Sequence, residues 1–352
     1  MLRACVGAAL VAFCACEASV EDGEAVSRSM AARAPGEISL RNVYDLSYYF
    51  KVKLGGQKVK VAFRMGTPNS WVATKEATEG RPIRDESGGH YTYPHSESTT
   101  LERLNDTFDE ACGDGFWGTD VLAIDGLSVD EFRFGVVTSL ADVRAWEPNP
   151  FDGVIGLGLD RDGTVPLLEA MVAAGAIEKP VFSVVFGRGK PGYLSLGSTG
   201  NLDRYEGDPR YVGLDSSKGW SVPLEALWIG DDYCDFDARR AAFDPAMSPI
   251  TGPPSTVERF HREWQAERRA GMVVVPCDKD GPALSFRFDG RDYTLEKDDL
   301  ITKWKSLCLL NVDKAARTTD TWTLSEPFFR KYYAIFDAAE RRVGLAKARR
   351  DP

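Results

Sequence analysis

The side chains that most often perform catalysis or bind metals are scarce in this chain of 352 residues. It contains three histidines, His90, His95 and His261, and none of its seven cysteines belongs to a Cys-x-x-Cys pair. Structural zinc sites need four nitrogen or sulfur ligands at characteristic spacings, and we therefore expect no metal site. The chain also lacks the Gly-x-x-x-x-Gly-Lys-Ser/Thr loop that holds nucleotide phosphates. We expect no cofactor.

Carboxylates, in contrast, are abundant. Asp and Glu number 53 against 43 Lys and Arg, which gives a formal net charge of −10 at pH 7. A chain this acidic repels phosphate backbones. We therefore expect no nucleic-acid partner.

The N-terminal residues have the composition of an export signal. Arg3 precedes the apolar stretch Ala4–Cys16, and the small residue Ala18 follows it. This order is typical of a secretory signal peptide, here residues 1–18, and predicts a protein that is secreted or enters the lumen of the secretory pathway. The alternative is an ordinary buried helix. The stretch is too short to span a bilayer of about 30 Å, and we expect no integral membrane segment after signal removal.

Removal of the signal would leave four cysteines, Cys112, Cys234, Cys277 and Cys308. Four cysteines allow three pairings, and the sequence alone does not choose among them. The one N-glycosylation sequon begins at Asn105 and predicts a glycan at the surface of an exported protein.

The elements that must position any site are mostly strands. Residues 19–40 are polar and irregular and predict an exposed tail. Apolar residues then alternate with polar ones over residues 50–63 around Gly55-Gly56, which predicts a hairpin with one buried face. Further strands are expected at Val121–Ile124, Val181–Phe186, Tyr193–Leu196, Met272–Val275, Leu284–Phe288 and Ala334–Phe336.

Helical signals are fewer. One helix is expected at Leu167–Ile177, and a second after Pro253-Pro254, where Ser255 and Glu258 form a capping-box pattern. A faint repeat relates residues 61–67 to residues 241–247, as in a protein with two duplicated lobes. Many strands and few helices predict a mainly β protein.

A series of longer motifs follows in a fixed order. They are Arg64-Met65-Gly66-Thr67-Pro68-Asn69-Ser70-Trp71-Val72, Phe151-Asp152-Gly153-Val154-Ile155-Gly156-Leu157-Gly158, Gly192-Tyr193-Leu194-Ser195-Leu196-Gly197, Phe243-Asp244-Pro245-Ala246-Met247-Ser248 and Trp322-Thr323-Leu324-Ser325-Glu326-Pro327-Phe328-Phe329-Arg330. This ordered series resembles the pepsin-like aspartic proteases from about Tyr48 to Ala348. The resemblance implies a bilobal pepsin-like β fold with a cleft between related lobes, here residues 41–212 and 213–352.

The resemblance also locates the catalytic positions. In that family two aspartates, one from each lobe, share a proton and activate a water molecule. Here Arg64 occupies the first position and Asp244 the second. A guanidinium group stays protonated and cannot accept a proton from water. We expect Arg64 to face Asp244 in an ion pair that takes the place of the water.

At other positions, too, the sequence differs from the family pattern in ways that disfavour catalysis. Met65 and Pro245 replace the two threonines that cross-link the lobes, and Ser325 replaces a glycine beneath the second loop. Ala246 and Met247 change the second loop itself. The flap block is Cys112-Gly113-Asp114-Gly115, with Cys112 in the tyrosine position, where we expect a solvent-exposed or oddly paired cysteine and not a reactive thiol. The stretch after it is shorter than in the family, which predicts a stunted lid.

The resemblance further implies a disulfide between Cys277 and Cys308. It leaves Cys234 free, since Arg239 stands roughly where its partner would be. Residues 19–40 are then expected to be a short N-terminal tail or a remnant prosegment. Their only basic residues are Arg28 and Arg33, so they offer little to neutralise an acidic cleft.

These features predict a secreted pepsin-family protein that is proteolytically inactive or severely impaired and that binds an extended peptide or protein ligand in the interlobe cleft. The alternative is an active aspartic endopeptidase with an atypical site. A wall-associated or carbohydrate-linked binding role is a further class, which no feature of the chain supports specifically.

Overall fold

The computed structural model describes residues 36–78, 92–146, 149–160, 164–215, 219–234, 238–245, 249–317 and 319–349. The expected signal peptide and most of the expected tail lie outside these ranges. The tail prediction is wrong at its end, because residues 37–40 belong to strand β1 (Glu37–Val43). Ile38 and Leu40 are buried there, and β1 pairs with a later strand along residues 192–195.

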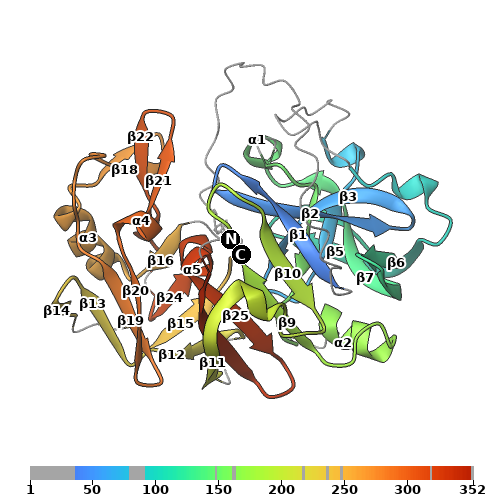
Figure 1. Ribbon diagram of the computed structural model, residues 1–352. Coiled ribbons are helices and arrows are strands. Elements are labelled where there is room, and N and C mark those ends of the chain that lie inside the picture. The colour runs from blue at the N-terminus through green and yellow to red at the C-terminus, as the bar shows by residue number, and fades with distance from the viewer. Residues whose placement is uncertain are drawn as a thin grey trace, which may run out of the picture.

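The fold is mainly β with two lobes, as expected (Figure 1). A 13-stranded sheet runs through both lobes, in the order β11 (Tyr205–Gly213), β26 (Arg342–Ala348), β25 (Tyr332–Asp337), β9 (Val181–Val185), β10 (Gly192–Leu196), β1, β2 (Ser47–Leu54), β3 (Gln57–Arg64), β8 (Gly153–Gly156), β4 (Trp71–Ala73), β7 (Leu127–Leu140), β6 (Gly113–Ile124) and β5 (Glu102–Glu110).

Three smaller sheets form the rest of the second lobe. They are β12 (Ser221–Pro223), β15 (Arg240–Phe243), β24 (Thr321–Leu324), β16 (Ile250–Gly252) and β23 (Val312–Lys314); β14 (Asp232–Tyr233), β13 (Ala226–Ile229), β19 (Leu284–Phe288) and β20 (Arg291–Leu295); and β17 (Glu267–Arg269), β18 (Met272–Val275), β22 (Leu307–Leu310) and β21 (Ile301–Trp304).

The helices are short. They are α1 (Val143–Trp146), α2 (Leu167–Ala173), α3 (Pro254–Glu263), α4 (Lys297–Leu300) and α5 (Glu326–Lys331). Among the residues described above, no helix is long and apolar enough to cross a membrane.

Two local predictions are corrected. The capping box at α3 is wrong, because the N-cap is Pro253, without a side-chain hydrogen bond, and Glu258 contacts Lys314 at 3.0 Å instead. The single buried face of the β2–β3 hairpin is wrong for β3, where Lys60 is 1% and Ala62 4% exposed. β3 is an interior strand of the large sheet, between β2 and β8, and residues on both of its faces are buried.

The internal repeat is confirmed by the strand pairings. In the first half of the chain, β3 pairs parallel with β8, β8 antiparallel with β4, and β4 parallel with β7. In the second half, β15, β24, β16 and β23 pair in the same order and with the same directions. Arg64 ends β3 and Asp244 follows β15, and the two residues are 180 positions apart. The duplication therefore makes them equivalent.

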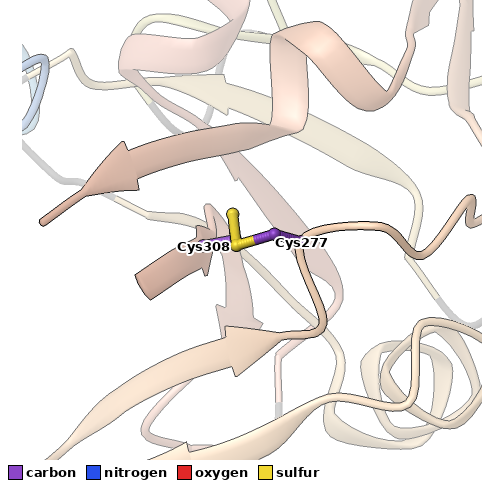
Figure 2. The surroundings of a disulfide bond; sticks show 2 residues. All are labelled: Cys277 and Cys308. Atoms are coloured by element: carbon purple, nitrogen blue, oxygen red, sulfur yellow. A yellow bond between two sulfur atoms is a disulfide. The ribbon is translucent and has the colours of Figure 1, made fainter. Parts of the chain in front are cut away.

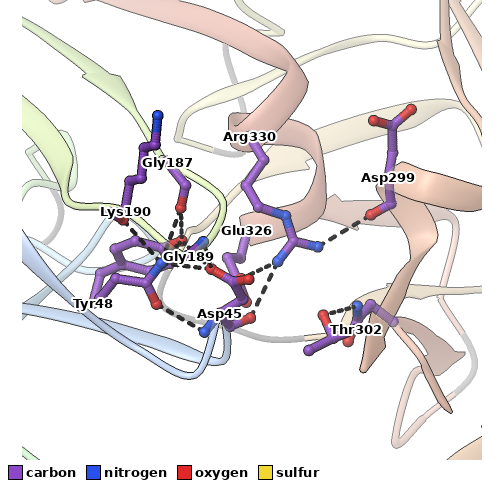
Figure 3. Close-up of polar contacts among 11 residues, drawn as sticks. Asp45, Tyr48, Gly187, Gly189, Lys190, Asp299, Thr302, Glu326 and Arg330 are labelled. Atoms are coloured by element: carbon purple, nitrogen blue, oxygen red, sulfur yellow. Dashed lines mark hydrogen bonds and ion pairs between the residues drawn. The ribbon is translucent and has the colours of Figure 1, made fainter. Parts of the chain in front are cut away.

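A buried ion pair helps to join the two lobes (Figure 3). Arg330 donates to Glu326 at 2.6 Å, and the side chains are only 3% and 1% exposed. The same guanidinium donates to the backbone oxygens of Asp45, in the turn between β1 and β2, and Asp299, on α4, both at 3.1 Å. One side chain thus fixes a turn of the first lobe against the second.

The cysteines are arranged as the resemblance implies. Cys277, just after β18, forms a disulfide with Cys308 on β22 (Figure 2). Cys234 is buried and unpaired, while Cys112 is unpaired and half-buried. Cys112 is therefore neither solvent-exposed nor paired, and that expectation is wrong, because the side chain packs against an apolar cluster.

Candidate functional site

The candidate site lies where the two duplicated strand ends meet. Val61 and Phe63 on β3 point into the core, and Arg64 ends the strand with its side chain 38% exposed. Asp244 directly follows β15 and its side chain is 8% exposed. The Nη2 atom of Arg64 lies 3.5 Å from Oδ2 of Asp244. The two residues are thus in contact across the lobes, as the sequence predicts.

The Asp244 carboxylate receives a second donor from the same loop. The backbone N–H of Met65 lies 3.4 Å from Oδ1, and the backbone N–H of Asp244 donates to Leu324 at 3.0 Å. The Arg64 guanidinium and the Met65 N–H therefore contact the Asp244 carboxylate. Sharing its proton would need a second carboxylate in the place that Arg64 occupies. The pair therefore offers one carboxylate and no second carboxylate to share its proton.

Two other acidic residues, Asp114 and Asp120 on β6, do not provide that partner. Asp114 lies exposed on β6. Asp120 is 1% exposed and accepts hydrogen bonds from Tyr93 at 2.5 Å, Thr100 at 2.5 Å and Ser98 at 2.7 Å. Burial raises the pKa of Asp120, but these hydrogen bonds outweigh it and hold the pKa below its usual range. Asp120 is therefore fixed in the first lobe as a structural carboxylate.

The two halves differ in the residue that supports each loop. Beside Arg64, Gly156 leaves no room for a side chain, since a Cβ atom there would lie 2.4 Å from the carbonyl of Pro68. In the second half the equivalent position, after the Leu324 that pairs with Phe243, is Ser325. Ser325 is fully buried, and its hydroxyl has no hydrogen-bond partner among the described residues. The close packing beneath the first loop is therefore not repeated beside Asp244.

The predicted flap is the hairpin β5–β6, with Ala111 and Cys112 as its turn. Glu110 pairs with Gly113 across this turn. On its other side, Gly113 already pairs with Leu140 of β7, so β6 has a neighbour on both sides from its first residue. The hairpin therefore ends level with β7, as expected for a stunted lid.

Cys112 sits at this tip and packs against an apolar cluster that includes Ala73, Phe108, Val137 and Trp146. Burial raises the pKa of the Cys112 thiol to about 12, with a smaller contribution from the nearby Glu110 carboxylate. A pKa this high keeps the thiol neutral at physiological pH. The sequence could not show this, because the cluster gathers residues from four separate segments.

One polar contact of the flap gave no signal in the sequence. Asn69, in the loop after β3, donates from Nδ2 to Oε1 of Glu110 at 2.9 Å. The two residues are 41 positions apart, so only the tertiary structure brings them together.

Next to the site, a cavity of about 20 Å³ lies between the lobes. It has room for about one water molecule. Its lining consists of Leu46, Ser47, Tyr48, Ala62, Phe63, Phe151, Phe186 and Pro245.

Some residues named from the sequence cannot be placed at the site. Ala246, Met247 and Ser248 lie outside the described residues, as does His90. Asn105 lies on β5 and is exposed, as the sequon at a surface requires.

Comparison with known proteins agrees with this geometry. The profile of the family described as eukaryotic aspartyl protease matches residues 47–348. Renin of Rattus norvegicus is 29% identical over 94% of this chain and 87% of its own length. Cathepsin D of Chionodraco hamatus is 29% identical over 91% and 85%. Pregnancy-associated glycoprotein 2 of Bos taurus is 27% identical over 88% and 84%. Together with the duplicated strand pattern, the profile match over most of the chain means that this protein belongs to the eukaryotic aspartyl protease family.

Proposed function

We propose that this chain is a pepsin-family protein that has lost, or nearly lost, peptide hydrolysis, and that it uses its interlobe cleft to bind an extended peptide or a protein loop. The observation that supports this most directly is the contact between Arg64 and Asp244 at 3.5 Å. Hydrolysis in this family needs a general base for the water and a general acid for the carbonyl oxygen, and a coupled pair of carboxylates supplies both.

Arg64 can supply neither function. It has no lone pair available to take a proton from water, and its positive charge favours the ionised form of Asp244, which therefore cannot act as an acid. Met65 and Pro245 also lack the hydroxyl groups of the family threonines. What remains is a surface between two lobes, of the kind that binds peptides by backbone pairing.

Active proteolysis is the second candidate. It is favoured by the family match over residues 47–348 and by relatives such as those named renin and cathepsin D. The test is to incubate the purified protein with an acid-denatured substrate protein from pH 2 to pH 7, with and without pepstatin, beside a cathepsin D control. We expect no pepstatin-sensitive cleavage. Cleavage that pepstatin abolishes would establish the second candidate instead.

A stepwise restoration sharpens this test. The variant Arg64→Asp should remain without robust turnover, because Met65, Pro245 and Ser325 are unchanged. The combined variant that also carries Met65→Thr, Pro245→Thr and Ser325→Gly should hydrolyse peptides faster than Arg64→Asp alone. Robust turnover from the single change would mean that the other departures matter little.

Peptide binding is tested separately. A random-peptide phage library is panned on the purified protein, and enriched peptides are measured by fluorescence polarisation and by hydrogen exchange of the complex. We expect protection in residues 64–69 and near 110–113. Enriched peptides that protect only other regions would contradict binding in the cleft.

We also propose that the protein enters the secretory pathway and carries a glycan on Asn105. The disulfide Cys277–Cys308 fits an oxidising compartment, and Asn105 is exposed. In eukaryotic cells we expect secretion and a mass loss with N-glycosidase that Asn105→Gln abolishes. Cytosolic retention of an unglycosylated chain would contradict this.

A further inference from the structure

We propose that the β5–β6 hairpin is a fixed wall of the cleft and not a lid that opens and closes. A lid must swing away from the body of the lobe, and a hairpin can do so only over the length by which it projects beyond its neighbours. Here that length is the turn of Ala111 and Cys112. The inference concerns motion and holds whether or not the protein hydrolyses peptides.

The backbone pairing provides the first argument. Along β6, Gly113 pairs with Leu140 and Asp114 with Ser139, while β5 occupies the other edge of the strand. The pairing even continues past the strand, because the backbone N–H of Ala141 donates to the carbonyl of Cys112 at 3.0 Å. Opening the hairpin would break bonds to β7 that a projecting hairpin does not have.

Close packing of the two backbones provides the second. At Gly115 a Cβ atom would lie 1.9 Å from the carbonyl oxygen of Val136 on β7. Only glycine allows this approach, which occurs at the irregularity between Asp114 and Gly115. A bulge at this point bends and twists the strand against its neighbour. The tip half of β6 is thus packed against β7.

Side chains on both sides of the turn provide the third. Cys112 lies in the apolar cluster with Ala73, Phe108 and Trp146. Glu110 accepts the hydrogen bond from Asn69 in the loop that follows Arg64. The turn is therefore attached to the lobe interior through Cys112 and to the loop that follows Arg64 through Glu110.

Two consequences follow for a ligand. Its entry and release need no movement of the hairpin. A ligand N–H that donates to the carbonyl of Cys112 would also be its second donor, because this oxygen already accepts from Ala141.

Hydrogen exchange followed by mass spectrometry tests the inference on the full chain. We expect amides of residues 113–118, the tip half of β6, to exchange within about tenfold of those of residues 119–124, the base half. Exchange of the tip half a hundredfold or more faster than the base half would overturn the fixed wall.

Two variants test the contacts themselves. Ala141→Pro removes the N–H that reaches Cys112, and Asn69→Ala removes the bond to Glu110. Each should accelerate exchange of the tip half tenfold or more and leave the base half unchanged. The matched control is Asn201→Ala, whose side chain accepts from Asp203 before β11, and it should leave both halves unchanged. If Ala141→Pro fails to fold, Asn69→Ala decides alone, and no acceleration in it would overturn the assigned attachment.

Discussion

Arg64 and Asp244 occupy equivalent positions in the two halves of a duplicated strand pattern, and their side chains meet 3.5 Å apart at the junction of the lobes. Duplication should give two like residues at two like positions. Instead a cation faces an anion. The two halves therefore keep the same strand pairings but carry side chains of opposite charge at the equivalent position.

The energetic coupling of this pair should be small. The Arg64 side chain is 38% exposed and its Nη2 atom contacts Asp244 at the limit of hydrogen-bond distance, and ion pairs with a solvent-exposed partner contribute at most about 1 kcal/mol. A double-mutant cycle with Arg64→Gln and Asp244→Asn, measured by urea unfolding, should give a coupling below that value. A coupling above about 3 kcal/mol would identify a desolvated salt bridge instead.

The disulfide should contribute strongly to stability. Cys277 and Cys308 are 31 positions apart, and closing a loop of this length stabilises a protein by about 3–4 kcal/mol through the unfolded state. The double variant Cys277→Ser with Cys308→Ser should lose this amount in urea unfolding. Reducing agent should destabilise the wild type by the same amount and leave the variant unaffected, and an unaffected wild type would contradict the prediction.

Asp120 should stabilise the fold at neutral pH and not in acid. Its folded-state pKa lies below the usual value, so its contribution is present above the unfolded pKa of about 3.9 and is lost as the pH falls through the folded pKa. Asp120→Asn should cost about 2 kcal/mol at pH 7, since charged acceptors make the stronger hydrogen bonds.

Measuring the unfolding free energy of the wild type and of Asp120→Asn as a function of pH tests this prediction. The stability gap between wild type and Asp120→Asn should narrow as the pH falls below about 4, whereas the exposed Asp106→Asn should show little gap at any pH. A gap that stays constant down to pH 2 would show that the charge of Asp120 is not what stabilises the fold.

Cys112 should be nearly inert in the folded protein. With its pKa raised to about 12, its thiolate fraction at pH 8 is about a thousandfold below that of an ordinary thiol. Alkylation by iodoacetamide, followed for Cys112 by mass spectrometry, should therefore be slow at pH 8 and fast after denaturation. A titration midpoint near pH 8.5 in the folded protein would contradict this.

Much of the fold could be predicted because its signals are local. The hairpin around Gly55-Gly56 is confirmed as β2 and β3, and the strands expected later in the chain are present. The helix expected over Leu167–Ile177 is shorter, α2 ending at Ala173 before Gly175, which has a φ of 67°. The errors about burial share one cause, which is that burial depends on neighbours distant in sequence. Ile38 lies between polar residues and Lys60 is itself polar, yet both are buried.

The sequence by itself determined the scaffold and the identity of the residues at its two critical positions, because strand periodicity and motif order are properties of short segments. It established that an arginine stands at the first position and an aspartate at the second. Only the tertiary structure decided their distance, the protonation of Cys112, the burial of Ser325 without a hydrogen-bond partner among the described residues, and the attachment of the flap to β7. Each of these depends on contacts between segments far apart in the chain, and such contacts leave no periodicity or spacing to read.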